Sequence, residues 1–152
     1  MDTSPILVAD DDSLGVELIL EALTDFRFVN ETQVVRDGEE ALDYLYRRGL
    51  FTTRTQGNPA LILLDLKMPK VDGLEVLRQV RADQDLQFIP VVILTSSLEE
   101  QDIVASYTSG ANAYVVKPLD FAEFMQAIKH LGICWMVLNK PPRGSVVSMR
   151  QL

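Results

Sequence analysis

The chain has 152 residues and a formal net charge of −8, with 14 Lys and Arg against 22 Asp and Glu. This length fits one domain of ordinary size, and 47% hydrophobic with 24% charged residues is typical of a folded rather than a disordered protein. A negative field repels phosphate backbones, so we expect no nucleic acid as a direct partner.

Three features of the sequence indicate a cytoplasmic protein with no membrane segment. Met1–Pro5 is short and not basic, unlike a signal peptide, and the longest apolar run, 133–138, is far too short to cross a bilayer. The single cysteine, Cys134, cannot form an internal disulfide, which is consistent with a reducing compartment.

Five short apolar runs alternate with amphipathic segments along the chain. The runs, which we expect to be strands, are 6–9, 32–35, 61–64, 91–94 and 114–116. They are continuous rather than alternating with polar residues, as in strands of a parallel sheet that are covered on both faces. The second run is flanked by polar residues and fits an edge strand.

The segments between the runs carry apolar residues at helical spacing. Ser13 is placed to cap the first helix, and the next two follow the turns at 37–38 and 72–73. Gly110 suits the end of the fourth helix. The fifth has the best periodicity, a stripe that we assign to the core: Phe121, Phe124, Met125, Ile128 and Leu131. Strand–helix alternation with right-handed crossovers predicts an α/β protein with a doubly wound (βα)5 parallel sheet.

Polar groups follow four of the five expected strands. They are Asp10-Asp11-Asp12 after the first, Asp65 after the third, Thr95-Ser96 after the fourth and Lys117-Pro118 after the fifth. Ligands of open parallel sheets bind outside the carboxyl ends of the strands. We therefore expect acids, a hydroxyl and an ammonium at one rim of the sheet.

The acids of this rim favour a cation and phosphoryl chemistry. If the first and third strands are neighbours, Asp10, Asp11 and Asp65 lie within several ångströms, and charges about 5 Å apart repel by about 3 kcal/mol. Such a cluster recruits a cation, and an oxygen-lined site suits Mg²⁺, with Mn²⁺ as a substitute. With Lys117 as a second positive charge, Asp65 is the best candidate for a nucleophile that forms an acyl phosphate.

Together with their neighbours, these residues resemble the receiver domain of two-component response regulators. The matching pattern is Asp10-Asp11, Asp65 in Leu-Leu-Asp-Leu-Lys-Met-Pro, Asp72-Gly73, Thr95, Tyr114 and Lys117-Pro118. It runs in order from Ile6 to about Leu131 and is more specific than any single short motif. The resemblance implies a flavodoxin-like fold with strand order 2-1-3-4-5.

The resemblance also implies a role for each matching residue. Asp65 would accept phosphate from the phosphohistidine of a sensor histidine kinase. Mg²⁺ would be held by Asp10, Asp11, Asp65 and the backbone carbonyl of Lys67. Thr95 and Lys117 would contact the phosphoryl group, Thr95 and Tyr114 would form the switch, and the Lys117–Pro118 bond would be cis. Such a protein is a phosphoacceptor rather than an enzyme, with self-catalysed phosphotransfer and autodephosphorylation only.

A narrower resemblance is to small stand-alone regulators, several of which serve phytochrome-type kinases and form homodimers. It rests on the long loop before the third strand and on the apolar C-terminal extension with Trp135. We assign residues 1–131 to the receiver domain and 132–152 to an extension without a separate output domain. The apolar cluster 134–136 either folds back over the domain or lies in a subunit interface. We favour a homodimer through the fourth helix, fifth strand, fifth helix and this extension.

Two other functions fit parts of the pattern. A phosphatase of the haloacid dehalogenase type also uses Asp, Thr or Ser, and Lys, but its motif needs a second Asp two residues after the nucleophile, where this chain has Lys67. A phosphorylation-independent scaffold would be a receiver that has lost its chemistry. The presence of all the expected functional residues argues against it.

Overall fold

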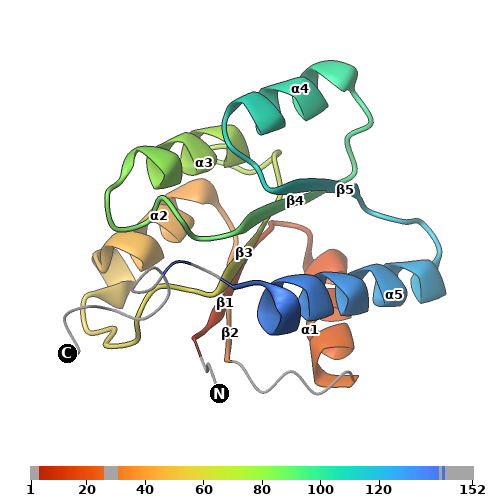
Figure 1. The fold of residues 1–152 in the computed structure, drawn as a ribbon, viewed down its shortest axis with the longest axis horizontal. Helices are drawn as coiled ribbons and strands as arrows, with labels where there is room; N and C mark the ends of the chain where they lie inside the picture. The colour runs from red at the N-terminus through yellow and green to blue at the C-terminus, as the bar shows by residue number, and fades with distance from the viewer. Residues whose placement is uncertain (1–3, 26–30, 141, 143–152) are drawn as a thin grey trace.

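The computed structural model describes residues 4–25, 31–140 and 142. Within them, five strands alternate with five α-helices, as the apolar runs predict (Figure 1). The elements are β1 (Ile6–Ala9), α1 (Ser13–Asp25), β2 (Thr32–Val35), α2 (Gly38–Tyr46), β3 (Leu61–Leu64), α3 (Gly73–Ala82), β4 (Val91–Thr95), α4 (Glu100–Thr108), β5 (Ala113–Val116) and α5 (Phe121–Gly132). A short 3₁₀ helix over Gly49–Phe51 follows α2, and a π-helical segment over Ile133–Leu138 continues from α5.

The five strands form one parallel sheet in the order β2-β1-β3-β4-β5. Ile6 of β1 is in register with Thr32 of β2 on one side and Leu61 of β3 on the other. The two outer strands are β2 and β5, so the prediction of an edge strand at 32–35 is confirmed. The predicted α/β fold class and strand order are confirmed as well.

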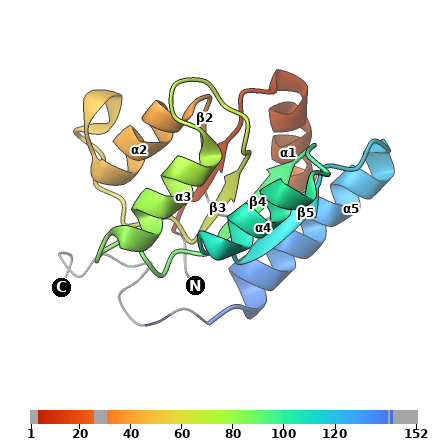
Figure 2. The same ribbon diagram turned by 90° about the horizontal axis from the view of Figure 1, so that it is seen from above.

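Two layers of helices cover the sheet. α1 and α5 lie on one face, and α2, α3 and α4 follow one another across the other face (Figures 1 and 2). Successive strand residues point to opposite faces. In β1, for example, Ile6 and Val8 join the hydrophobic cluster beneath α1 and α5, while Leu7 and Ala9 join the cluster beneath α2 and α3. This double burial explains why β1, β3 and β4 are apolar at nearly every position.

Aspartates begin three of the helices. Asp37, Asp72 and Asp120 each accept a hydrogen bond from the backbone N–H three residues later, which satisfies a free amide at the start of α2, α3 and α5. The expectation that Ser13 caps α1 is wrong. Ser13 is the first residue of the helix, and the carbonyl of Asp12 accepts the first helical hydrogen bond, from Val16.

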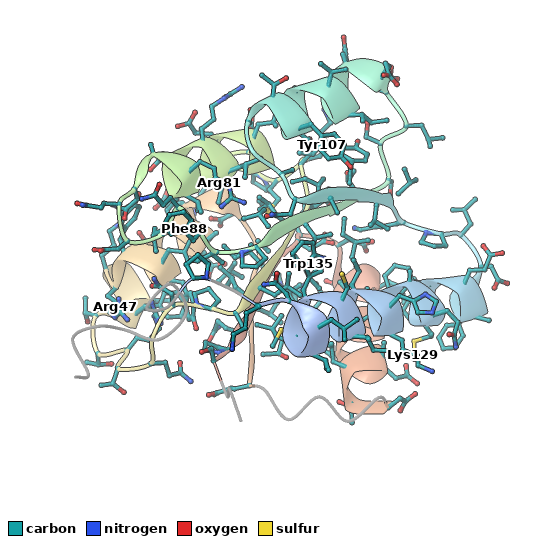
Figure 3. The ribbon with its side chains drawn as sticks, viewed as in Figure 1. Arg47, Arg81, Phe88, Tyr107, Lys129 and Trp135 are labelled. Atoms are coloured by element: carbon teal, nitrogen blue, oxygen red, sulfur yellow. The ribbon has the colours of Figure 1, made fainter. Side chains whose placement is uncertain are left out.

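The C-terminal part of the described chain packs partly on the domain. Trp135, in the π-helical segment after α5 (Figure 3), is half-buried with Met136 against the cluster beneath α1 and α5. Phe121 differs from the expected core stripe, because it lies on the first turn of α5 and is 54% exposed. Most of the predicted extension 132–152 lies outside the described residues, namely 141 and 143–152. None of the described helices combines the length and the hydropathy needed to span a membrane.

Candidate functional site

Three carboxylates meet at the carboxyl edge of the sheet. Asp10 and Asp11 follow β1, and Asp65 follows β3, which is the neighbouring strand. One oxygen of each of the three lies within 4.8 Å of the others. Asp10 and Asp65 are buried, and Asp11 is exposed. The cluster that the sequence predicts is therefore present, with one carboxylate open to solvent.

A lysine from the next-but-one strand completes this cluster. Lys117 follows β5, its side chain is only 8% exposed, and its Nζ lies 2.6 Å from Asp10 Oδ2 and 3.3 Å from Asp65 Oδ2. A weaker contact of 4.0 Å reaches Asp12. Because one ammonium faces several carboxylates, the site keeps an excess of negative charge, as a cation site requires.

Burial and charge pull on these groups in opposite directions. Burial raises the pKa of Asp10, and it outweighs the hydrogen bonds from Lys117 and from the backbone N–H of Asp12, which favour the charged form. Burial alone would lower the pKa of Lys117, but its hydrogen bond to Asp10 and the charge of Asp65 together raise it. Lys117 therefore stays protonated at neutral pH, and the buried charge of Asp10 lowers the stability of the folded protein.

The turn after β3 holds Asp65 against the start of α3. The backbone N–H of Gly73 donates to the carbonyl of Leu66 at 2.9 Å. A Cβ at position 73 would overlap the carbonyl oxygen of Asp65, so this close approach requires glycine. The backbone N–H of Lys67 lies 3.5 Å from Asp65 Oδ1. The Asp-Gly pair at 72–73 therefore both starts α3 and shapes the floor of the site.

Thr95 and Tyr114 lie on neighbouring strands behind the acids. Thr95 ends β4 and is buried, and its Oγ1 is 3.5 Å from the backbone N–H of Ser97. The hydroxyl of Tyr114, from β5, donates to the carbonyl of Ser97 at 3.0 Å. The Tyr114 ring packs against the cluster beneath α2 and α3. Both side chains thus meet at Ser97, in the loop that leads to α4.

The expectation of a cis Lys117–Pro118 bond is wrong in this structure, because no peptide bond between described residues is cis. Trans is the form that X–Pro bonds favour, by about 0.5–1 kcal/mol. Lys117 reaches both Asp10 and Asp65 with the trans bond in place, so its contacts do not depend on the cis form.

Sequence reasoning missed a second ionic contact beside the acids. Lys67 Nζ lies 3.6 Å from Asp102 Oδ2 on α4, and the same oxygen accepts a hydrogen bond from the Ser97 hydroxyl at 2.6 Å. Lys67 and Asp102 line the same depression as Asp11, with a volume of about 340 Å³. No spacing rule links a loop after β3 with a helix after β4, so only the folded chain reveals this pair.

Comparison with known proteins identifies the family. Residues 6–129 match the model of the response regulator receiver domain. The response regulator Rcp1 of Synechocystis sp. is 34% identical over 131 residues, which are 86% of this chain and 88% of Rcp1.

Solved structures agree with this match. A crystal structure of the phosphorylated cyanobacterial phytochrome response regulator RcpA has a TM-score of 0.87 and 36% identity, over 93% of this chain and 99% of that one. The Mn²⁺-bound form of Rcp1 has a TM-score of 0.84 and 33% identity, over 91% and 99%. The bacteriophytochrome response regulator RtBRR has a TM-score of 0.75 and 58% identity, over 99% and 90%.

These likenesses exclude the haloacid dehalogenase alternative, since they extend over most of the chain and agree with both the observed strand order and the acid cluster. The chain belongs to the response regulator receiver family and is homologous to phytochrome response regulators.

Proposed function

We propose that Asp65 is the residue of this response regulator that accepts a phosphoryl group from the phosphohistidine of a sensor histidine kinase. The observation that carries the proposal is the contact of Asp65 Oδ2 with Lys117 Nζ at 3.3 Å, within a cluster of three carboxylates. Asp65 has an oxygen beside a fixed cation, so an anionic group arriving there meets positive charge. Asp11, the exposed member of the three carboxylates, leaves the cluster open to solvent.

The residues present fit a divalent cation. Asp10, Asp11 and Asp65 each bring one oxygen into a common region within 4.8 Å, and hard oxygen ligands suit Mg²⁺ or Mn²⁺. We propose these three carboxylates and the backbone carbonyl of Lys67 as the ligands. When bound, the ion supplies positive charge that neutralises phosphoryl oxygens. The Mn²⁺-bound form of Rcp1 supports a divalent site in this family.

In the reaction, a carboxylate oxygen of Asp65 forms a bond to phosphorus while the bond from phosphorus to the imidazole nitrogen of the donor breaks. Lys117 stays protonated and balances the charge of the phosphoryl oxygens, because its raised pKa keeps it cationic. Asp10 positions Lys117 through the 2.6 Å contact. The buried Thr95 hydroxyl, at the end of β4, is the proposed donor to the phosphoryl group.

Thr95 and Tyr114 are the proposed switch. The phosphoryl group on Asp65 carries roughly −1.5 to −2 charges. A new hydrogen bond that the Thr95 hydroxyl donates to it draws Oγ1 towards Asp65 and away from the Ser97 N–H, from which Oγ1 accepts at 3.5 Å. Because the Tyr114 hydroxyl holds the Ser97 carbonyl, a shift of Ser97 is transmitted to the tyrosine and to the start of α4. Two charge-assisted hydrogen bonds, at about 1.5–3 kcal/mol each, are enough to shift the balance between the resting and the switched conformation substantially.

The partner is a histidine kinase, and we propose one of the phytochrome type. The support is the likeness to the regulators RcpA and RtBRR, whose names connect them with phytochromes.

We further propose residues 1–131 as the receiver domain and 132–152 as an extension of it. The protein would be cytoplasmic, without a nucleic acid or membrane partner. The family match over 6–129 supports the first boundary.

A homodimer through α4, β5, α5 and the C-terminal segment is also proposed. All four residues of β5 are only half-buried. Large apolar side chains are exposed around this edge and on the segment after α5: Leu98, Tyr107, Leu119, Phe121, Val137 and Leu138. Size-exclusion chromatography with light scattering, with and without Mg²⁺ and beryllofluoride, tests this association. A monomer under every condition would rule it out.

Incubation with acetyl phosphate and Mg²⁺ tests the phosphoacceptor. Intact-mass measurement of the wild type should show the addition of one phosphoryl group, and Asp65→Asn should show none while keeping its fold. Asp12→Asn is the matched control, because it removes a neighbouring exposed acid and should still be labelled. Stoichiometric labelling of Asp65→Asn would show that another residue is the nucleophile.

A further inference from the structure

The contact between Lys67 and Asp102 joins a fixed anion to a cation with room to move. The Asp102 side chain is 14% exposed and is held by the Ser97 hydroxyl at 2.6 Å. The Lys67 side chain is 73% exposed, and its Nζ is 3.6 Å from Asp102 Oδ2. Of the two partners, only Lys67 can change its orientation without breaking buried hydrogen bonds.

The main chain of Lys67 lies beside the proposed phosphoacceptor, Asp65. Its backbone N–H lies 3.5 Å from Asp65 Oδ1, and its side chain lines the same depression as Asp11 and Asp102. A flexible lysine whose main chain lies beside Asp65 has two anions within its reach once Asp65 carries an anionic group. In the structure it is engaged with the one on α4.

We propose that Asp102 is a positioning residue that keeps the Lys67 ammonium away from Asp65 until an anion bound there competes for it. This inference rests on the proposed phosphoacceptor function. When Lys67 turns to the anion, Asp102 loses its cationic partner but keeps Ser97, the residue that Tyr114 also contacts. The exchange gives the site a second link to the first turn of α4, separate from Thr95.

The weakness of the resting contact is what makes the exchange feasible. An ion pair with a largely exposed ammonium contributes little, because water and salt screen it, and Lys67 is the exposed partner here. A phosphoryl group or its analogue, with more than one negative charge shared among several oxygens, is a stronger competitor for the same ammonium. Removing the charge of Asp102 should therefore strengthen anion binding about two- to fivefold.

The experiment is a double-mutant cycle on beryllofluoride affinity, measured by titration calorimetry at a Mg²⁺ concentration that saturates each variant. Asp102→Asn keeps an oxygen for the Ser97 hydroxyl but removes the charge, so it should bind beryllofluoride about two- to fivefold more tightly than the wild type. Lys67→Gln should bind less tightly. In the Lys67→Gln background, Asp102→Asn should have no effect, because the cation that it positions is gone.

Glu100→Gln is the matched control, because it removes one exposed negative charge from the same first turn of α4. It should leave the affinity unchanged. Equal affinity of Asp102→Asn and the wild type would overturn the inference, and so would a gain that persists in the Lys67→Gln background, which would indicate plain charge repulsion. A wild type that binds no beryllofluoride at all would instead refute the proposed function.

Discussion

Two partly buried cations, Lys117 and Arg81, are held in opposite ways. Lys117 is surrounded by carboxylates, with Asp10 and Asp65 within 3.3 Å. Arg81 lies on α3 (Figure 3), one of the helices that cover the opposite face of the sheet from α1 and α5, and it forms no ion pair among the described residues. Its guanidinium donates instead to four neutral oxygens at 2.7–2.9 Å: the carbonyls of Gly110, Gln87 and Ile89 and the side chain of Asn112.

The difference separates a responsive site from a structural one. The charges around Lys117 do not balance, so a metal ion or an anion can change them. The donors of Arg81 are matched by neutral acceptors in the loops before β4 and β5, and burial lowers its pKa with no charged partner involved. We therefore expect Arg81 to control stability alone, and the Lys117 cluster to respond to cations and pH.

The largest effect should come from Arg81→Met, which leaves the four acceptors without their donor. We expect the free energy of unfolding to fall by about 3 kcal/mol, since each unpaired polar group costs about 1–3 kcal/mol and some of these reach water. Urea denaturation measures the loss, which should be the same with and without Mg²⁺. The control is Arg78→Met on the same helix, where an exposed pair with Glu75 should change stability by less than about 0.5 kcal/mol.

An intermediate effect should come from the cation. At a Mg²⁺ concentration ten times its Kd, the wild type should gain about 1.4 kcal/mol in unfolding free energy. Asp11→Asn should lose most of this gain, because Asp11 is the exposed member of the three carboxylates. Asp12→Asn should keep it. An equal gain in Asp11→Asn and the wild type would show that Mg²⁺ stabilises the protein elsewhere.

The smallest effect should come from Asp10→Asn without metal. Removing this charge ends the cost of burying it and relieves repulsion from Asp65, but it weakens the hydrogen bond that Lys117 donates. Stability at pH 7 should therefore rise by about 1 kcal/mol.

The pH dependence has a defined sign, because the folded pKa of Asp10 is raised. Its contribution to stability is present below the unfolded pKa of about 3.9 and is lost as pH rises through the folded pKa. The advantage of Asp10→Asn, measured by urea denaturation in EDTA, should therefore grow from pH 4 to pH 7. An advantage that is independent of pH would contradict this assignment of the buried charge.

The sequence predicts the strands, and the polar residues at the carboxyl edge of the sheet, for a physical reason. A strand covered on both faces is apolar at consecutive positions, so 6–9 and 61–64 have the predicted bounds. The edge strand 32–35 also has the predicted bounds, although three of its four residues are only partly buried. Parallel strands then bring Asp10, Asp65 and the other terminal residues to one edge without further information.

Other features depend on contacts that sequence spacing does not encode. Lys67 meets Asp102 only because α3 and α4 lie on the same face of the sheet (Figure 2). In the sequence, Arg81 looks like any other polar residue of α3. In the structure, it donates hydrogen bonds to both the loop before β4 and the loop before β5. Phe121 has the helical periodicity of a core residue, but the first turn of α5 extends beyond the packed sheet, which leaves the ring exposed.

The proposed phosphoacceptor function requires the three carboxylates to bind one divalent cation beside Asp65. Anomalous scattering from a wild-type crystal soaked in Mn²⁺ tests it most directly. We expect a single strong peak among the carboxylates of Asp10, Asp11 and Asp65 and the carbonyl of Lys67. A strong peak elsewhere, with none at this edge of the sheet, would contradict it.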